Sequence, residues 1–137
     1  MKNIFITGGA GFIGSHVCEE IFHTFKKSKI IIFDKLTYAG NKLYIQNLIN
    51  SPRVKFIKGD IKNYFSYSKL LKKIDLAINI AAESHVDHSF TNPISFSLTN
   101  TVGAHTFLLN CINNKVKKVV HISSDEVYGE KLSGKCD

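Results

Sequence analysis

Two hydrophobic periods alternate along the chain. Short apolar runs suited to buried β-strands are separated by stretches in which apolar residues recur three or four positions apart, as in an amphipathic helix. The runs predict strands at Ile4–Ile6, Lys29–Phe33, Val54–Lys58, Asp75–Ile80 and Lys117–Ser123. The stretches between them predict helices from about Ile13 to Lys27, over Leu43–Ile49, over Tyr64–Lys73, and from Asn92-Pro93 to about Asn113. This alternation predicts an α/β fold with a parallel sheet covered by helices on both faces.

A glycine-rich stretch joins the first strand to the first helix. Gly8, Gly11 and Gly14 stand three apart, and glycine lets a strand-to-helix turn approach a pyrophosphate without an intervening Cβ. The helix that follows would offer free N–H groups to that pyrophosphate. Asp34 ends the second apolar run about 20 residues later, where a ribose-binding carboxylate is expected. The stretch therefore predicts a dinucleotide site on a doubly wound, Rossmann-type sheet, with a plain strand–turn–helix as the alternative.

The composition narrows the class of protein. The 137 residues, 44% of them hydrophobic, suit one globular domain. No apolar run is long enough to span a membrane and the first residues do not read as a signal peptide, so we expect a cytoplasmic protein that uses no membrane. The three cysteines, Cys18, Cys111 and Cys136, are widely spaced and are interpreted as reduced thiols.

The formal charge of +7 does not indicate a nucleic-acid partner. The lysines cluster where helices are predicted to end, and cations there complement the helix dipole. Arginine, which nucleic-acid surfaces favour, occurs only at Arg53. The clustered lysines are Lys26, Lys27, Lys29, Lys72, Lys73, Lys115, Lys117 and Lys118.

Polar residues follow the predicted strands, at the edge where a parallel sheet binds its ligand. They include Asp34, Asp60, Ser84 and the adjacent pair Asp125 and Glu126. Asp34 and Asp60 could instead be turn carboxylates, and the adjacent pair could be solvated loop acids. If the fifth strand has ended by about Ser124, the adjacent carboxyls can serve one site. Their repulsion would raise one pKa, giving an acid beside a base, as an elimination requires.

Six motifs together resemble the dTDP-glucose 4,6-dehydratases, which are NAD-dependent members of the extended short-chain dehydrogenase/reductase and epimerase/dehydratase family. The resemblance covers essentially the whole chain. Its most discriminating parts are the second motif and the Asp-Glu pair, since related sugar epimerases and the UDP-glucuronate decarboxylase lack that pair. The motifs are T-G-G-A-G-F-I-G-S-H (Thr7–His16), D-K-L-T-Y-A-G-N (Asp34–Asn41), G-D-I (Gly59–Ile61), A-A-E-S-H-V-D (Ala81–Asp87), T-N-x-x-G (Thr99–Gly103) and S-S-D-E-V-Y-G (Ser123–Gly129).

The resemblance implies NAD as the cofactor, and it implies which residues hold each part of that cofactor. The carboxylate of Asp34 at the ribose favours NAD, because it would repel a 2′-phosphate. The implied contacts are Gly8, Gly11, Phe12, Ile13 and Gly14 at the pyrophosphate; Asp34, Lys35, Leu36 and Thr37 at the adenosine ribose; Asp60 and Ile61 at the adenine; and Ile80, Ala81, Ala82, Ser84 and Thr99 along the nicotinamide half.

The resemblance also implies a reaction, the conversion of dTDP-glucose to dTDP-4-keto-6-deoxyglucose in deoxysugar biosynthesis. Ser84 and Ser124 would touch the hexose, Asp125 would protonate the departing hydroxyl at carbon 6, and Glu126 would take the proton from carbon 5. Oxidation at carbon 4 acidifies the hydrogen at carbon 5, and return of the hydride to carbon 6 regenerates NAD in place. The family needs no metal and suggests a homodimer.

The chain departs from the family pattern at several points. Ser124 stands for the usual Thr, and His88 for the usual Arg; a metal site at His85, Asp87 and His88 is disfavoured. The one Tyr-x-x-x-Lys string, Tyr38–Lys42, lies at the adenosine end and is not expected to be catalytic. We therefore expect residues 1–137 to be an incomplete NAD-binding domain without its C-terminal sugar-nucleotide domain, inactive alone. A non-catalytic dinucleotide-binding module, a chain completed by a second polypeptide, and another sugar-nucleotide epimerase, dehydratase or decarboxylase are the alternatives.

Overall fold

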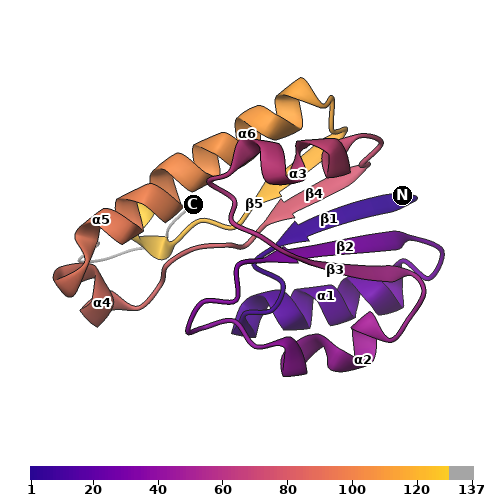
Figure 1. The fold of residues 1–137 in the computed structure, drawn as a ribbon, viewed down its shortest axis with the longest axis horizontal. Coiled ribbons are helices and arrows are strands. Elements are labelled where there is room, and N and C mark those ends of the chain that lie inside the picture. Colours follow the sequence, from indigo (N-terminus) through magenta and orange to yellow (C-terminus); the bar gives the residue numbers. More distant parts are fainter. Residues whose placement is uncertain (130–137) are drawn as a thin grey trace.

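The five strands form one parallel sheet in the order β3-β2-β1-β4-β5 (Figure 1). The computed structural model describes residues 1–129, with every side chain in that range except those of Asp125 and Glu126; Cys136 lies outside the described residues. The order reverses between β1 and β4, the switch point at which a doubly wound sheet opens its ligand crevice. The predicted fold class is confirmed. The strands are β1 (Asn3–Thr7), β2 (Lys29–Asp34), β3 (Val54–Lys58), β4 (Leu76–Asn79) and β5 (Lys118–His121).

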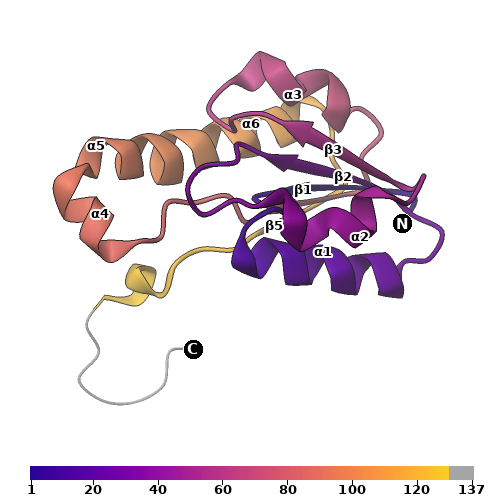
Figure 2. The same cartoon turned by 60° about the horizontal axis from the view of Figure 1, so that its bottom comes forward.

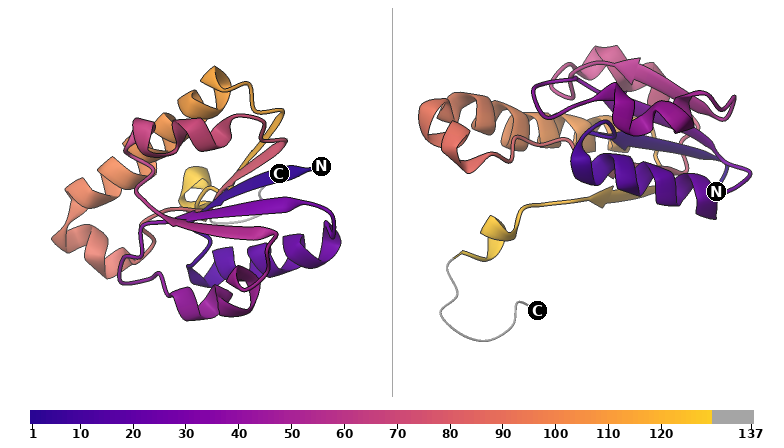
Figure 3. Two further views of the ribbon diagram at one scale, coloured as in Figure 1. Left: turned by 45° about the vertical axis from the view of Figure 1, so that its right-hand side comes forward. Right: turned by 90° about the horizontal axis from the view of Figure 1, so that it is seen from below.

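Helices cover both faces of the sheet, as Figures 2 and 3 show. α1 (Phe12–Thr24), the 3-10 turn η1 (Lys42–Ile45) and α2 (Gln46–Ile49) lie on one face, and α3 (Tyr64–Leu71) and α6 (Ala104–Asn113) lie on the other (Figure 1). Alternate residues of β1 serve the two cores: Ile4 and Ile6 face α1, whereas Phe5 packs against Tyr67 and Phe107. All three β1 residues are fully buried, as expected for a parallel strand.

α1 ends at Thr24 and not near Lys27 as the hydrophobic period predicts. Arg53, just before β3, satisfies the carbonyl groups at this helix end. Its guanidinium donates to the carbonyl oxygens of Phe22 (3.3 Å), Phe25 (3.3 Å) and Ser28 (3.2 Å) and lies 4.0 Å from the centre of the Phe22 ring. The fork of donors that only arginine offers stops the helix here.

The helix predicted from Asn92 to Asn113 is divided into three parts. Asn92 caps it as expected, its side-chain oxygen accepting from the Ser95 N–H at 3.3 Å. α5 (Pro93–Phe96) leads into a π-helical stretch, η2 (Ser97–Gly103), before α6 begins. A further short helix, α4 (Val86–Thr91), precedes it and was not predicted. α4 buries no side chain, so it leaves no hydrophobic period to detect.

β5 differs from the other strands because all four of its residues are exposed. Val119 and Val120 retain 40% and 44% of their accessible surface. The prediction of a sheet covered on both faces is therefore wrong for β5. Within residues 1–129, β5 pairs only with β4, and no element covers its outer edge.

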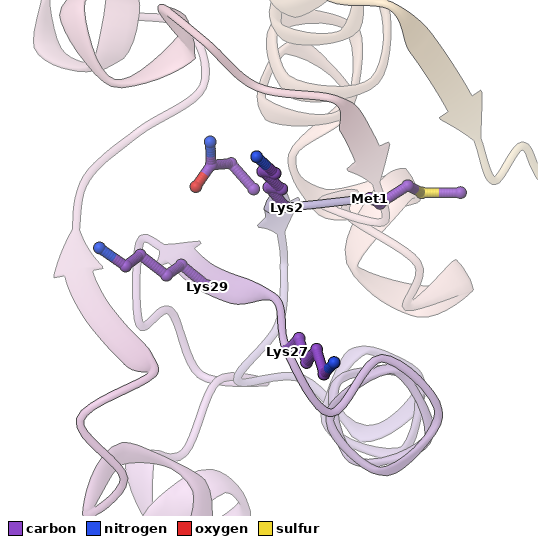
Figure 4. Close-up of a pocket in the computed structure, with 5 residues that line it drawn as sticks. Met1, Lys2, Lys27 and Lys29 are labelled. Carbon is purple, nitrogen blue, oxygen red and sulfur yellow. The ribbon is translucent and has the colours of Figure 1, made fainter.

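The clustered lysines lie at the amino edge of the sheet, directly after α1, α3 and α6, so they follow helix ends as predicted. A cavity of about 480 Å³ opens there, lined by Met1, Lys2, Asn3, Lys27 and Lys29. The labelled lysine side chains in Figure 4 point in different directions and do not converge on one point. Because an anion site needs donors aimed at a common position, this cavity does not have the geometry of a ligand site.

Asp75 is the acidic residue among these lysines, and it ties three parts of the amino edge together. Its carboxylate accepts from the Lys117 ammonium at 2.5 Å and from the backbone N–H groups of Lys2 (2.8 Å) and Asn3 (3.0 Å). These bonds, led by that of Lys117, hold the pKa of Asp75 well below its usual range. A depressed folded-state pKa stabilises the fold above the unfolded value of about 3.9, and that stabilisation is lost as the pH falls.

We therefore expect Asp75→Asn to flatten the acid limb of the stability curve. Urea midpoints measured between pH 2 and pH 7 should fall less steeply below about pH 4 in the variant than in the parent chain. Asp87→Asn, at an exposed carboxylate in α4, should leave the slope unchanged. Equal slopes for the parent and Asp75→Asn would contradict the prediction.

Cys18 and Cys111 are free and buried, as the sequence indicates for reduced thiols. Burial raises the pKa of each to about 12, with the charge of Asp34 adding to the effect at Cys18. No helix among residues 1–129 has the length and apolar character required to span a membrane.

Candidate functional site

The glycine turn after β1 packs directly against the end of β4. Gly8 has φ +70°, in the left-handed region, and a Cβ on it would lie 2.5 Å from the backbone nitrogen of Ala81. A Cβ on Gly14 would collide with the carbonyl oxygen of Gly8, whereas one on Gly11 would lie 3.3 Å from the same oxygen. Gly8 and Gly14 are therefore required by the turn itself.

The first turn of α1 opens toward the crevice with free donors. Gly11 occupies the N-cap position, and no described side chain caps the helix. The first turn also carries no acidic residue, so its N–H groups and the positive end of the helix dipole are available to an anion. Phe12 and Ile13 are largely exposed, at 74% and 59%.

Asp34 lies at the end of β2 and is almost completely buried, at 8% exposure. One carboxylate oxygen accepts from the Ala10 N–H at 2.9 Å, and the other accepts from the Leu36 N–H at 2.7 Å. Asp34 thus fixes the glycine turn to the loop after β2. Each carboxylate oxygen has two acceptor positions, so capacity remains for the hydroxyl groups of a ribose.

Asp60, after β3, pairs with the lysines on either side of it in space. The Lys35 ammonium is 2.9 Å from one carboxylate oxygen and the Lys62 ammonium 3.6 Å from it, and the Lys62 N–H donates to the other at 3.0 Å. Partial burial acts to raise the pKa of Asp60, but the Lys62 N–H and the Lys35 ammonium outweigh it, and the net pKa is lowered. Asp60 is therefore held as a carboxylate beside the loop that contains Lys35 and Thr37.

Ile61, the neighbour of Asp60, belongs to the core. Its side chain is 4% exposed and packs beneath Gly103, where a Cβ would lie 2.9 Å from it. Its carbonyl oxygen accepts from the Tyr67 hydroxyl at 2.9 Å. Any contact of Ile61 with a ligand would therefore involve its backbone.

The loop after β4 forms the other wall of the crevice. Ile80 and Ala81 are half-buried, Ala82 and Ser84 are exposed, and Thr99 of η2 is half-buried. The side chain of Asn100 holds this loop, because it accepts from the Glu83 N–H and donates to the Glu83 carbonyl oxygen, both at 2.8 Å. Asn100 was not predicted as a site residue, although the T-N-x-x-G motif contained it.

A chain of polar side chains crosses the carboxyl ends of β1, β4 and β5. Asn79 bonds to the Thr7 hydroxyl at 2.5 Å and to the Nδ1 atom of His121 at 2.9 Å. Thr7 and Asn79 are fully buried. None of these three residues was predicted to belong to the site. The sequence did offer one signal, a polar residue at the end of an otherwise apolar run.

Ser124 and the acidic pair follow β5. The strand ends at His121, before Ser124, as required if Asp125 and Glu126 are to serve one site. Ser124 is exposed, and the backbone of the pair lies in a 3-10 turn, η3 (Asp125–Tyr128). The side chains of Asp125 and Glu126 are outside the described set, so their pairing as acid and base stays a prediction.

No group of three or more His, Cys, Asp or Glu side chains within residues 1–129 is arranged to hold a metal ion. His85 and His88 instead stack on each other, with ring centres 4.9 Å apart and planes at 28°.

Comparison with known proteins identifies close relatives of the whole chain. A family model described as GDP-mannose 4,6 dehydratase matches residues 5–137. The dTDP-D-glucose 4,6-dehydratase of Dictyostelium discoideum is 42% identical over 134 residues, which is 96% of this chain and 31% of the relative. A trifunctional UDP-glucose 4,6-dehydratase of Arabidopsis thaliana is 40% identical over 132 residues, 94% of this chain and 20% of its own length.

Solved structures agree with the sequence relatives. The dTDP-glucose 4,6-dehydratase of Streptomyces venezuelae, crystallised with NAD bound, superposes with a TM-score of 0.92 at 38% identity, over 98% of this chain and 43% of the solved one. The chain thus spans less than half the length of each of these three proteins.

Proposed function

Because the chain belongs to the GDP-mannose 4,6-dehydratase family, we propose that it binds NAD in the crevice at the carboxyl edge of the sheet and forms the cofactor-binding part of a nucleotide-sugar 4,6-dehydratase. The observation that carries this proposal is the glycine turn. Gly8 and Gly14 leave no room for a Cβ, and the uncapped first turn of α1, which contains Gly14, begins four residues after Gly8. That combination suits a pyrophosphate.

The residues around the turn fit the rest of a dinucleotide. Asp34 has acceptor capacity for ribose hydroxyls, and its negative charge disfavours a 2′-phosphate. Leu36 and Thr37 continue the same loop, and Asp60, which is paired with Lys35, would contact the adenine together with the backbone of Ile61. Ile80, Ala81, Ala82, Ser84 and Thr99 would hold the nicotinamide half. When bound, NAD supplies the oxidation and reduction that the family's reaction requires.

The sugar chemistry would fall to residues after β4 and β5. Ser84 and Ser124 would hold the hexose, Asp125 would protonate the leaving hydroxyl, and Glu126 would remove the proton from the neighbouring carbon. The substrate we propose is a nucleoside-diphosphate glucose. Relatives of about equal identity to this chain are named for dTDP-glucose and for UDP-glucose. We favour dTDP-glucose, because two of the three relatives described above are named as dTDP-glucose dehydratases.

Calorimetric titration of the chain with NAD tests the proposal. We expect NAD to bind, NADP to bind more weakly, and the double variant Asp125→Asn, Glu126→Gln to bind NAD as well as the parent, because these acids would face the sugar. Absence of NAD binding by the folded parent chain would refute the proposal. Loss of NAD binding in the double variant would refute the roles given to the two acids.

We also infer that the isolated 137-residue chain aggregates or dimerises through the outer edge of β5. All four residues of β5 are exposed, and within residues 1–129 its outer backbone groups pair with no other strand, an arrangement that readily pairs with another chain. Light scattering at increasing concentration should give a mass that rises from 15.4 kDa to twice that value or more. Val120→Lys, which places a charge on the edge, should keep the chain monomeric, and a parent chain that stays monomeric at high concentration would contradict the inference.

A further inference from the structure

Tyr38 lies in the loop after β2 but contacts the segment after β4. Its ring centre is 4.8 Å from that of His88, with the planes at 67°, and 6.3 Å from that of His85. The edge-to-face arrangement on His88 is a favourable geometry for aromatic rings. Tyr38 thus joins two loops that are separated by the whole of β3, α3 and β4 in the sequence.

Glu83, in the same segment, lines the cavity between the two loops together with Tyr38. Partial burial and the Glu83 charge raise the pKa of Tyr38, so the phenol stays protonated at neutral pH and able to donate. Glu83 is a firm anchor, since Asn100 holds its backbone on both sides.

The two loops that Tyr38 joins lie on opposite sides of the glycine turn. β2 and β4 flank β1 on opposite sides, so a contact between their loops spans the glycine turn that follows β1. The loop after β2 is also tied to that turn, because the Asn41 N–H donates to the Ala10 carbonyl oxygen at 2.9 Å. A cavity of about 440 Å³ lies between the joined loops, lined among others by Thr37, Tyr38, Glu83 and His88.

We propose that Tyr38 is a positioning residue that bridges the loops after β2 and β4, and so fixes the adenosine and nicotinamide halves of the cofactor site relative to each other. This inference rests on the proposed function. It gives a role to the tyrosine of the string Tyr38–Lys42 that is structural to the site and not catalytic. The bridge matters for a ligand that touches both loops and not for one that touches only the loop after β2.

Binding of two ligands, NAD and AMP, distinguishes a Tyr38 that bridges the two loops from a Tyr38 that acts only within its own loop. We expect Tyr38→Ala, which removes the ring packed on His88, to weaken NAD binding by about 3- to 10-fold, the range for loss of one aromatic pair, while the affinity for AMP, which carries only the adenosine half, changes less than twofold. His88→Ala should weaken NAD binding similarly, and the double variant should be no weaker than the worse single variant. Tyr44→Ala is the matched control, since Tyr44 and Tyr38 are both 57% exposed.

Three results would overturn the inference. NAD affinity unchanged in both Tyr38→Ala and His88→Ala would show that the bridge is not used. An equal fall in NAD and AMP affinity would show that Tyr38 only shapes its own loop. Failure of the parent chain to bind NAD or AMP would refute the proposed function and this inference together, which distinguishes that failure from the first two.

Discussion

Gly14→Ala is expected to destabilise the protein by about 1–3 kcal/mol and to weaken NAD binding by more than about tenfold. The added Cβ would collide with the carbonyl oxygen of Gly8, and relief of that collision must move the turn that we propose to hold the pyrophosphate. The sign of this change in stability is informative, because alanine in place of glycine within a helix ordinarily stabilises a protein by about 1 kcal/mol. Urea denaturation and calorimetric titration measure the two effects.

Gly11→Ala is the matched control for this prediction. Gly11 belongs to the same turn, but a Cβ there would lie 3.3 Å from the nearest described atom, the Gly8 oxygen, which small shifts can relieve. We expect its free energy of unfolding to stay within about 1 kcal/mol of the parent value. A Gly14→Ala protein as stable as the parent, or more stable, would contradict the packing argument.

Asp34→Ala is expected to cost about 1–3 kcal/mol of stability and to reduce NAD affinity by at least tenfold. The substitution leaves the buried N–H group of Ala10 and the half-buried N–H group of Leu36 without their acceptor, and it removes the carboxylate proposed to bind the ribose. Because the negative charge is lost as well, the ratio of NADP affinity to NAD affinity should rise. Urea midpoints and titrations with both dinucleotides measure these changes.

Two further variants make the Asp34 result specific. Asp34→Asn keeps one acceptor oxygen but turns an NH2 group toward one of the two donors, so its stability should also fall. Asp87→Ala removes an exposed carboxylate from α4 and should alter neither stability nor affinity by more than about 0.5 kcal/mol. An unchanged dinucleotide preference in Asp34→Ala would remove Asp34 from the ribose site.

The sequence predicted those parts of the fold that bury apolar side chains at a regular spacing. β3 was predicted with its observed bounds, and β1, β2 and β4 within two residues at each end. α4 was missed because it buries nothing, and the early end of α1 depends on Arg53, a residue distant in sequence. The π-helical winding of η2 also has no counterpart in the hydrophobic period, which continues through it.

Site residues divide in a similar way. Gly8, Gly14 and Asp34 could be predicted because a turn, a close approach and a buried carboxylate each demand a particular residue type. Asn79 and Asn100 were not identified, since the roles of their side chains depend on partners 42 and 17 positions away, at His121 and Glu83. Tyr38 was assigned to the adenosine end alone, and only the fold brings it to His88.

The π-helical stretch η2 makes chain length itself a constraint in this region. An α-helix completes a turn in about 3.6 residues, whereas π winding takes in an extra residue. Deleting Thr101 would restore ordinary winding and turn everything before it by roughly 100° about the helix axis relative to α6. Asn100 would then swing away from Glu83, and the loop after β4 would lose the two hydrogen bonds that hold it. Relatives should therefore tolerate changes of residue type between Ser97 and Gly103 more readily than an insertion or deletion of a single residue.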